Sequence, residues 1–148
     1  MAAGVGAVYG QRMLTGFHHI TLNVSDLERS RRFYQALPEF VVDQDFPDRG
    51  KVRFRVGDQR TRLVLVTPVP GTPAGDRFSE RRIGLDHLAI GVTGGREALE
   101  TLERTLRDLG ADTDGIKLDR AGEAAMITFR DPDNIQWEFC EEAPPQAS

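Results

Sequence analysis

A short phrase that occurs twice constrains this sequence more than any other feature. Residues 19–25 read HITLNVS, and residues 87–93 read HLAIGVT. Both copies follow the order histidine, apolar, small, apolar, small, valine, hydroxyl, and their starts lie nearly half of the 148-residue chain apart. A repeat at such a spacing indicates a duplicated structural unit.

Each copy begins with the alternation of a strand and continues into the pattern of a helix. In the first copy, Ile20, Leu22 and Val24 alternate with polar residues, which predicts a half-buried strand. Apolar residues at helical spacing follow in both units, and these helices are expected to end at Pro38 and Gly110. The pattern predicts an α+β fold made of two tandem units. The further strands expected are 51–56, 61–67, 124–130 and 135–141, with room for another around 40–45.

We expect one domain, built from two modules that are joined by a linker rich in proline and glycine. The start of the chain lacks a basic stretch before its apolar residues, so we interpret it as a flexible extension and not as a signal peptide. The end contains two prolines and small residues and is expected to be disordered. The expected spans are 1–15 for the extension, 16–142 for the domain (module one about 16–68, linker 69–83, module two 84–142) and 143–148 for the tail.

The composition excludes several classes of protein. Charged residues make up 28% and hydrophobic residues 39% of the chain, as in ordinary globular proteins. A net charge of −4 gives no basic surface for nucleic acid, and no apolar run approaches the roughly 20 residues of a membrane helix. The single cysteine, Cys140, excludes an intramolecular disulfide framework and fits a reducing compartment, so we expect a cytoplasmic location.

The alternation places three candidate metal ligands on one face of the predicted sheets. Because successive residues of a strand face opposite sides, and the apolar set must face the helix, His19, His87 and Glu138 are expected to point away from the helices. A lone histidine at a strand start is more often a hydrogen-bonded or capping residue, and a lone glutamate is more often solvated. Because two histidines occupy matching positions of a repeat, a metal site and these structural roles are alternatives of equal weight. His18 lies on the opposite face and is interpreted as structural, and Cys140 is interpreted as a small buried hydrophobic residue.

Four other side chains are candidate substrate contacts. Arg53 and Arg55 alternate with the apolar residues of their strand and could contact an anionic substrate, although a solvated sheet edge is the more frequent reason for such a pattern. Thr21 and Gln136 share the face of the candidate ligands and could contact a substrate or support a ligand.

Together, these phrases resemble those of the vicinal oxygen chelate superfamily, which includes glyoxalase I, bleomycin-resistance proteins, fosfomycin-resistance enzymes and extradiol dioxygenases. The resemblance covers about Gly16 to Glu142. It implies tandem βαβββ modules that form a cupped, partly closed β-barrel around one divalent metal ion, which could be iron, manganese, zinc, cobalt or nickel.

Carried over by position, the ligands are His19, His87 and Glu138. The resemblance also implies a homodimer, in which His19 meets the other two ligands either within the chain or across the interface. The phrases that carry it are residues 17–27, 33–34, 84–90 and 129–139.

The chain departs from individual members of that superfamily. Glyoxalase I has a fourth ligand on the last strand of module one, where Leu65 stands here, and extradiol dioxygenases use a further histidine, for which only His18 remains. The segment 119–125 lacks the cation-binding loop of thiol-transferase fosfomycin enzymes. We therefore expect a metal-dependent enzyme of lyase, isomerase, dioxygenase or transferase type that chelates a small oxygenated substrate, which could be anionic, and no general base is identified. The alternative is a bleomycin-resistance-like protein that sequesters an antibiotic without catalysis.

Overall fold

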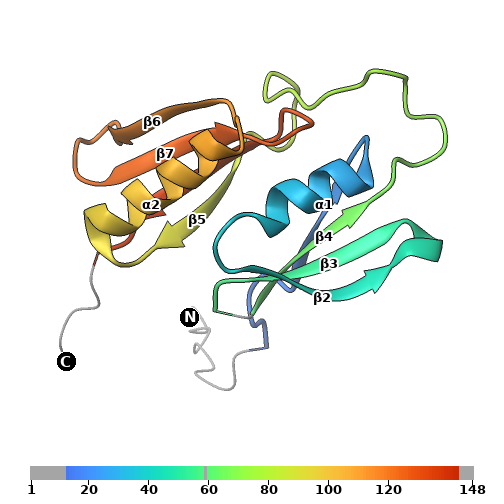
Figure 1. Cartoon of the computed structure of the whole chain (residues 1–148), viewed down its shortest axis with the longest axis horizontal. Coiled ribbons are helices and arrows are strands. Elements are labelled where there is room, and N and C mark those ends of the chain that lie inside the picture. The colour runs from blue at the N-terminus through green and yellow to red at the C-terminus, as the bar shows by residue number, and fades with distance from the viewer. Residues whose placement is uncertain (1–12, 59, 144–148) are drawn as a thin grey trace, which may run out of the picture.

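The computed structural model describes residues 13–58 and 60–143 and consists of two modules with the same order of elements. Each module is a four-stranded sheet with a helix on one face, and both helices lie on the same side of the molecule (Figure 1). Module one contains β1 (His19–Asn23), α1 (Leu27–Gln35), β2 (Phe40–Phe46), a 3-10 turn η1 (Pro47–Arg49), β3 (Lys51–Val56) and β4 (Thr61–Val66). Module two contains β5 (Leu88–Val92), α2 (Gly95–Asp108), β6 (Thr113–Leu118), β7 (Ala125–Arg130) and β8 (Gln136–Glu141).

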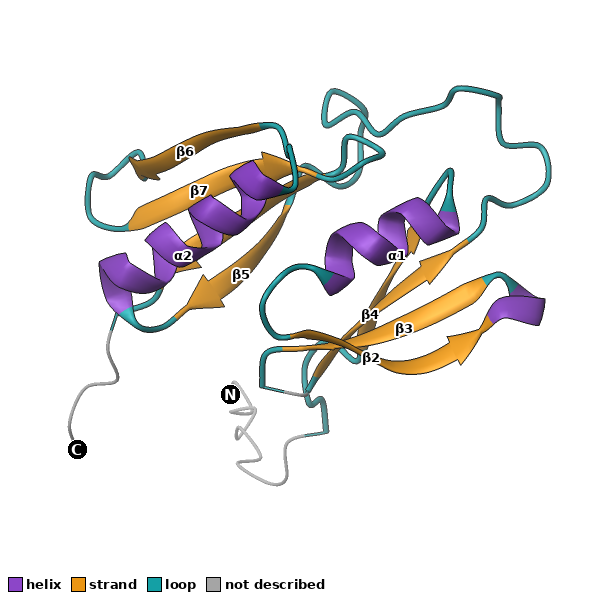
Figure 2. Ribbon diagram, in the orientation of Figure 1, coloured by secondary structure: helices purple, strands orange, loops and turns teal. Residues whose placement is uncertain are grey.

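The two sheets have equivalent topology. Their strand orders are β1-β4-β3-β2 and β5-β8-β7-β6, so the first strand of each module lies at an edge beside the fourth. The β1–β4 and β5–β8 pairs are parallel, and the other neighbours are antiparallel. The sheets are cupped and are not closed into a barrel, and the predicted α+β class is confirmed (Figure 2).

Local capping sets the ends of the helices. The Asp26 carboxylate accepts a hydrogen bond from the Arg29 backbone N–H at 2.9 Å, which satisfies a donor of the first turn of α1. After α2, Gly110 has a φ of +65°, the left-handed conformation that glycine adopts most readily. Among the described residues, no helix is long and apolar enough to cross a membrane.

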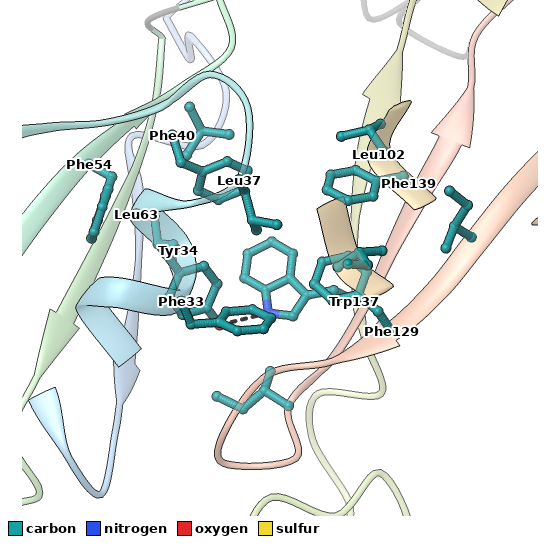
Figure 3. Close-up of a cluster of buried hydrophobic side chains, with 14 of the residues drawn as sticks. Phe33, Tyr34, Leu37, Phe40, Phe54, Leu63, Leu102, Phe129, Trp137 and Phe139 are labelled. Atoms are coloured by element: carbon teal, nitrogen blue, oxygen red, sulfur yellow. Dashed lines mark hydrogen bonds between the residues drawn. The ribbon is translucent and has the colours of Figure 1, made fainter. Parts of the chain in front are cut away.

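An aromatic core joins the two modules through α1 and β8. The Trp137 indole from β8 lies among Tyr34 and Phe33 of α1 on one side and Phe129 of β7 on the other (Figure 3). The indole N–H donates to the Tyr34 hydroxyl at 2.9 Å, and that hydroxyl donates to Asp131 at 2.6 Å. Burial, followed by the nearby Asp131 carboxylate, raises the pKa of Tyr34 well above its ordinary value, so the phenol stays neutral.

The turn between β7 and β8 docks module two onto the start of α1. The Ser25 backbone N–H donates to the Asp133 carboxylate at 3.0 Å, and the Ser25 hydroxyl donates to the other carboxylate oxygen. Within the turn, one Asp131 oxygen accepts from the backbone N–H groups of Asp133 at 2.9 Å and Ile135 at 2.8 Å. The Asp-Pro-Asp-Asn segment thus holds the modules together.

The outer edges of β1 and β5 carry no neighbouring strand within the described chain. Large apolar side chains are exposed close to the starts of both strands: Phe17 is 86%, Ile83 106% and Leu85 42% exposed. Native proteins usually cover or blunt such edges, because free N–H and C=O groups there can pair with another chain.

Candidate functional site

Module two brings two of the three predicted ligands together. Ala89 of β5 pairs with Glu138 of β8, and His87, two residues before Ala89, shares its face. The His87 Nε2 atom lies 3.3 Å from the Glu138 Oε2 atom. The Glu138 side chain is 17% exposed and the His87 side chain 37% exposed, so the pair can be reached from solvent.

The neighbouring carboxylate of Asp86 determines which ring nitrogen of His87 carries hydrogen. Its Oδ1 atom lies 2.6 Å from His87 Nδ1, and because an ionised carboxylate only accepts hydrogen bonds, Nδ1 is the donor. In the neutral ring, the lone pair of Nε2 then faces Glu138.

Two acceptor atoms at this distance require a cation between them, which is either a proton or a metal ion. Two ligands of one divalent ion, with bonds of about 2.0–2.2 Å and angles of roughly 90–110°, lie roughly 3.0–3.4 Å apart. The separation of 3.3 Å between His87 Nε2 and Glu138 Oε2 fits two donors to one metal ion and fits an imidazolium–carboxylate ion pair equally well. His87 and Glu138 therefore fit a metal ion both in donor chemistry and in spacing.

A hydrogen-bond network continues from His87 through Asp86 to Gln136 and Arg130. The Gln136 amide donates to Asp86 at 3.2 Å, and its oxygen accepts from Arg130 at 2.7 Å. Arg130 also binds both oxygens of Glu80 in the linker, at 2.9 and 3.0 Å. This arginine lowers the pKa of Glu80 to about 2. Gln136, predicted as a substrate or supporting contact, thus has both ends of its amide engaged.

The concave face of module two has room for a small molecule. A hollow of about 700 Å³ is lined by Glu138 and Gln136 of β8, by Thr128 of β7 and by residues of β6. Cys140, two residues after Glu138 on β8, is half-buried, and burial, followed by the charge of Glu138, raises the pKa of its thiol. A raised pKa disfavours the thiolate, in keeping with the prediction that Cys140 is not a nucleophile.

His19 does not join the other two predicted ligands within one chain. It lies exposed on β1 of module one, beside the exposed Thr21, and its Nδ1 atom is 2.8 Å from the Nδ1 atom of His18. Over residues 13–58 and 60–143, no group of three His, Cys, Asp or Glu side chains is arranged to hold a metal ion. The predicted triad is split between the faces of two modules.

Beside His19, the concave face of module one carries charged residues that sequence analysis recognised only in part. Arg53 donates to both oxygens of Asp43 at 2.9 and 3.1 Å, and Arg62 lies 3.1 Å from the same carboxylate. The Arg53 hydrogen bond is the main reason that the pKa of Asp43 is lowered. Arg62 pairs directly with His19 across β1 and β4, and with Arg55 across β4 and β3. Arg62 and Asp43 were missed, because their strands carry no regular alternation of charge.

The structure also corrects the position compared with the fourth ligand of glyoxalase I. Leu65 is completely buried in the core that faces the helices. The β4 residue that shares the face of Thr21 is its partner Val64. This side chain is also apolar, so β4 still provides no carboxylate at that position.

Comparison with known proteins places this architecture in a family. Residues 16–139 match the family model described as the Glyoxalase/Bleomycin resistance protein/Dioxygenase superfamily. The uncharacterized protein YwkD of Bacillus subtilis (strain 168) is 27% identical over 132 residues, which cover 88% of this chain and 99% of that protein.

Solved structures show the same fold. A glyoxylase/bleomycin resistance protein/dioxygenase domain from Frankia sp. EAN1pec is 27% identical, with a TM-score of 0.74, over 88% of this chain and 99% of that one. The fosfomycin resistance protein FosX from Mesorhizobium loti is 21% identical, with a TM-score of 0.65, over 88% and 95% of the two chains, a likeness of fold alone. The chain belongs to the Glyoxalase/Bleomycin resistance protein/Dioxygenase superfamily.

Proposed function

We propose that this protein is a divalent-metal-dependent enzyme that acts on a small oxygenated substrate, with each active site formed between two copies of the chain. His87 and Glu138 of one copy and His19 of the other would hold the ion. The observation that carries the proposal is the 3.3 Å separation of His87 Nε2 and Glu138 Oε2, with Asp86 bound to the other ring nitrogen. Two imidazoles and one carboxylate suit iron, manganese, zinc, cobalt or nickel.

The chemistry follows from the charge of such a site. A bound divalent ion acts as a Lewis acid that polarises a substrate oxygen or lowers the pKa of a bound water. Asp86 keeps the His87 ring in the orientation that presents Nε2, and Gln136 keeps Asp86 in place. The small residue Ala89 on the same face leaves space for a substrate beside the ion, whereas the Glu142 side chain packs over Gly91.

The proposed second copy accounts for the open edges of the sheets. His19 lies on the edge strand β1, and His87 immediately precedes the edge strand β5. Placing β1 of one copy beside β5 of another would cover both edges and the exposed side chains of Phe17 and Leu85. It would also bring His19 of one copy to the face that carries His87 and Glu138 of the other.

Mixed dimers test this arrangement. His19→Ala and Glu138→Ala subunits, each carrying a different affinity tag, are refolded or coexpressed together, and the doubly tagged dimer is isolated. If sites form between copies, one of the two sites in this dimer keeps all three ligands. We expect about one metal ion per mixed dimer, and none bound tightly by either parent variant.

The same experiment distinguishes the alternatives. A site within one chain would leave the mixed dimer without metal, because each chain then lacks one ligand. Equal metal content in the wild type and in both parent variants would overturn the ligand assignment. Glu123→Ala is the control, since it removes an exposed carboxylate away from the three ligands and should leave one ion bound per subunit.

The second candidate function is sequestration of an antibiotic without catalysis. It is favoured by a crevice of about 960 Å³ between the modules, where the apolar side chains of Ile20, Leu88 and Ile90 lie beside polar and charged ones. Stacking of a planar drug on Trp137 or Phe54 has less support, because these side chains are only 3% and 0% exposed. Titration of bleomycin into metal-stripped protein tests this function: tight binding that persists in His87→Ala would favour sequestration.

A further inference from the structure

A row of basic side chains crosses the concave face of module one next to His19. His19 pairs with Arg62 across β1 and β4, and Arg62 pairs with Arg55 across β4 and β3. Paired residues on neighbouring strands point to the same face, about 4.7–5.5 Å apart at their backbones. Arg53, two residues from Arg55 on β3, lies on the same face.

On this face, the strands of module one contribute more basic than acidic side chains. The strands β1, β3 and β4 contain no acidic residue, and β2 contributes Asp43 and Asp45. Asp45 is bound instead to Arg31 of α1, on the other side of the sheet. Asp43 is therefore the carboxylate of these strands that lies near the three guanidinium groups: it contacts Arg53 and Arg62 directly and interacts with Arg55 through space.

Stability alone does not account for this arrangement. Like charges placed directly opposite each other on neighbouring strands are destabilising, as Arg55 and Arg62 are here. The overall charge of the protein is −4, so the cluster stands out from an acidic molecule. Neighbouring guanidinium groups of this kind bind carboxylate or phosphate groups, which accept paired hydrogen bonds from arginine.

A break in β2 orients part of the cluster in advance. The register of the β2–β3 pair shifts between Val42 and Gln44, so that Asp43 lies in a β-bulge. A bulge re-aims side chains, and this one directs the Asp43 carboxylate between Arg53 and Arg62. The two arginines are thereby fixed, with the side chains of Arg53 and Arg62 only 29% and 24% exposed.

We propose that Arg55 and Arg62, with Arg53 held beside them by Asp43, form an anion subsite that binds a carboxylate, phosphate or phosphonate group of the substrate. The position of the rest of the substrate rests on the proposed metal site, because His19 belongs to the same row. The substrate class is then a small molecule with a metal-binding oxygen at one end and an anionic group roughly one to two strand spacings away, about 5–10 Å.

Anion binding to metal-free protein tests the subsite separately from the metal. Full-length protein stripped with chelator is titrated at low ionic strength with inorganic phosphate and, in parallel, with acetate, because salt screens such contacts. Binding is followed by calorimetry and by the NMR signals of the arginine Nε–H groups. We expect saturable binding of at least one anion, with the Arg55 signal among those that shift. Tighter binding of phosphate identifies a phosphate- or phosphonate-bearing substrate, and tighter binding of acetate a carboxylate.

Arg55→Gln is expected to weaken binding of that anion about tenfold while leaving the thermal midpoint unchanged or higher, since it relieves repulsion from Arg62. Arg104→Gln, which removes an equal charge from the exposed surface of α2, is the matched control and should bind as the wild type does.

No saturable binding by the wild type, or equal loss in both variants, would overturn the subsite. A lower thermal midpoint of Arg55→Gln with unchanged anion affinity would also overturn it, because Arg55 would then be a structural residue. None of these outcomes depends on whether the protein binds metal.

Discussion

A single carboxylate, Asp86, sets the chemical state of the candidate metal ligand beside it. Its bond to His87 Nδ1 leaves Nε2 as the ring nitrogen that faces Glu138. Partners of this kind, which bind the far side of a metal-ligating imidazole, fix its tautomer and orientation. Both Asp86 and His87 remain accessible to solvent, so the bond orients the ring more than it stabilises the fold.

Replacing this carboxylate tests its role. In Asp86→Ala, the His87 ring loses its acceptor, and we expect metal affinity to fall about 10- to 100-fold. The thermal midpoint should change little. Competition with a chromophoric chelator measures the affinity, and NMR of the metal-free protein reports the His87 tautomer. Asp86→Asn keeps an acceptor oxygen and should recover part of the affinity; equal affinity in all three proteins would contradict the assigned role.

At this scale, sequence predicts the residues that follow strand parity and misses those that do not. The faces of Thr21, Gln136 and Glu138 follow from alternation, because successive side chains of a strand must point to opposite sides. Asp86 precedes β5 and lies outside any periodic pattern, so nothing in the sequence marks it as the partner of His87. The position that corresponds to the fourth ligand was assigned to Leu65, and only the pairing of β1 with β4 shows that Val64 is the residue on the face of Thr21.

At the scale of elements, both modules show where sequence patterns fail. The strands β2 and β6 occupy the same outer position in their sheets, and both contain a register shift. A bulge inserts a residue and breaks the period of two, so β2 was expected only as room for a strand and β6 was not predicted. In β6, Gly115 has a φ of +80° and Leu118 is 63% exposed, which leaves little apolar alternation to detect. The strand β5 begins at Leu88, one residue after the start of the repeated phrase that predicts it.

The linker is attached to β7 by an ion pair whose pH dependence can be measured. The paired Arg130 lowers the pKa of Glu80 from 4.5 to about 2, so this contribution to stability is present above pH 4.5 and is lost as the pH falls towards 2. Glu80→Gln should therefore have a lower thermal midpoint than the wild type at pH 7, and the difference should shrink below pH 4.5 and vanish near pH 2. In an Arg130→Gln background, Glu80→Gln should have no such effect at any pH. A difference that stays constant from pH 7 to pH 2 would exclude the ion pair as its cause.

For the whole molecule, duplication made the fold predictable, because the repeated phrase requires two units of the same plan. The relative placement of the units was not predictable. It depends on the packing of Tyr34 against Trp137 and on the contact of Ser25 with Asp133, which join distant parts of the sequence. This placement separates His19 from His87 and Glu138 within one chain. Sequence left open whether the ligands meet within a chain or across an interface, because the residues are the same in both cases.

If two copies share each site as proposed, metal binding and dimerisation must be thermodynamically linked. An ion that binds the dimer more tightly than the monomer stabilises the dimer by mass action. We expect metal to lower the dimer dissociation constant of the wild type at least tenfold, as measured by sedimentation velocity over a dilution series. The dissociation constants of His19→Ala and Glu138→Ala should not respond to metal. A metal-independent dissociation constant for a wild type that binds metal would show that the ligands come from one chain.

The core between α1 and β8 also governs how the chain can fold as it is synthesised. The Trp137 indole that covers Tyr34 lies 103 residues further along the chain, and Asp133, which docks the start of α1, lies 108 residues after Ser25. A ribosome therefore completes the first helix long before it makes the strand that buries it. Contacts of such long sequence separation slow folding, and apolar surface that waits for its partner is prone to aggregation. The nascent first module must keep the aromatic face of α1 from other chains until almost the last residue of the domain has emerged.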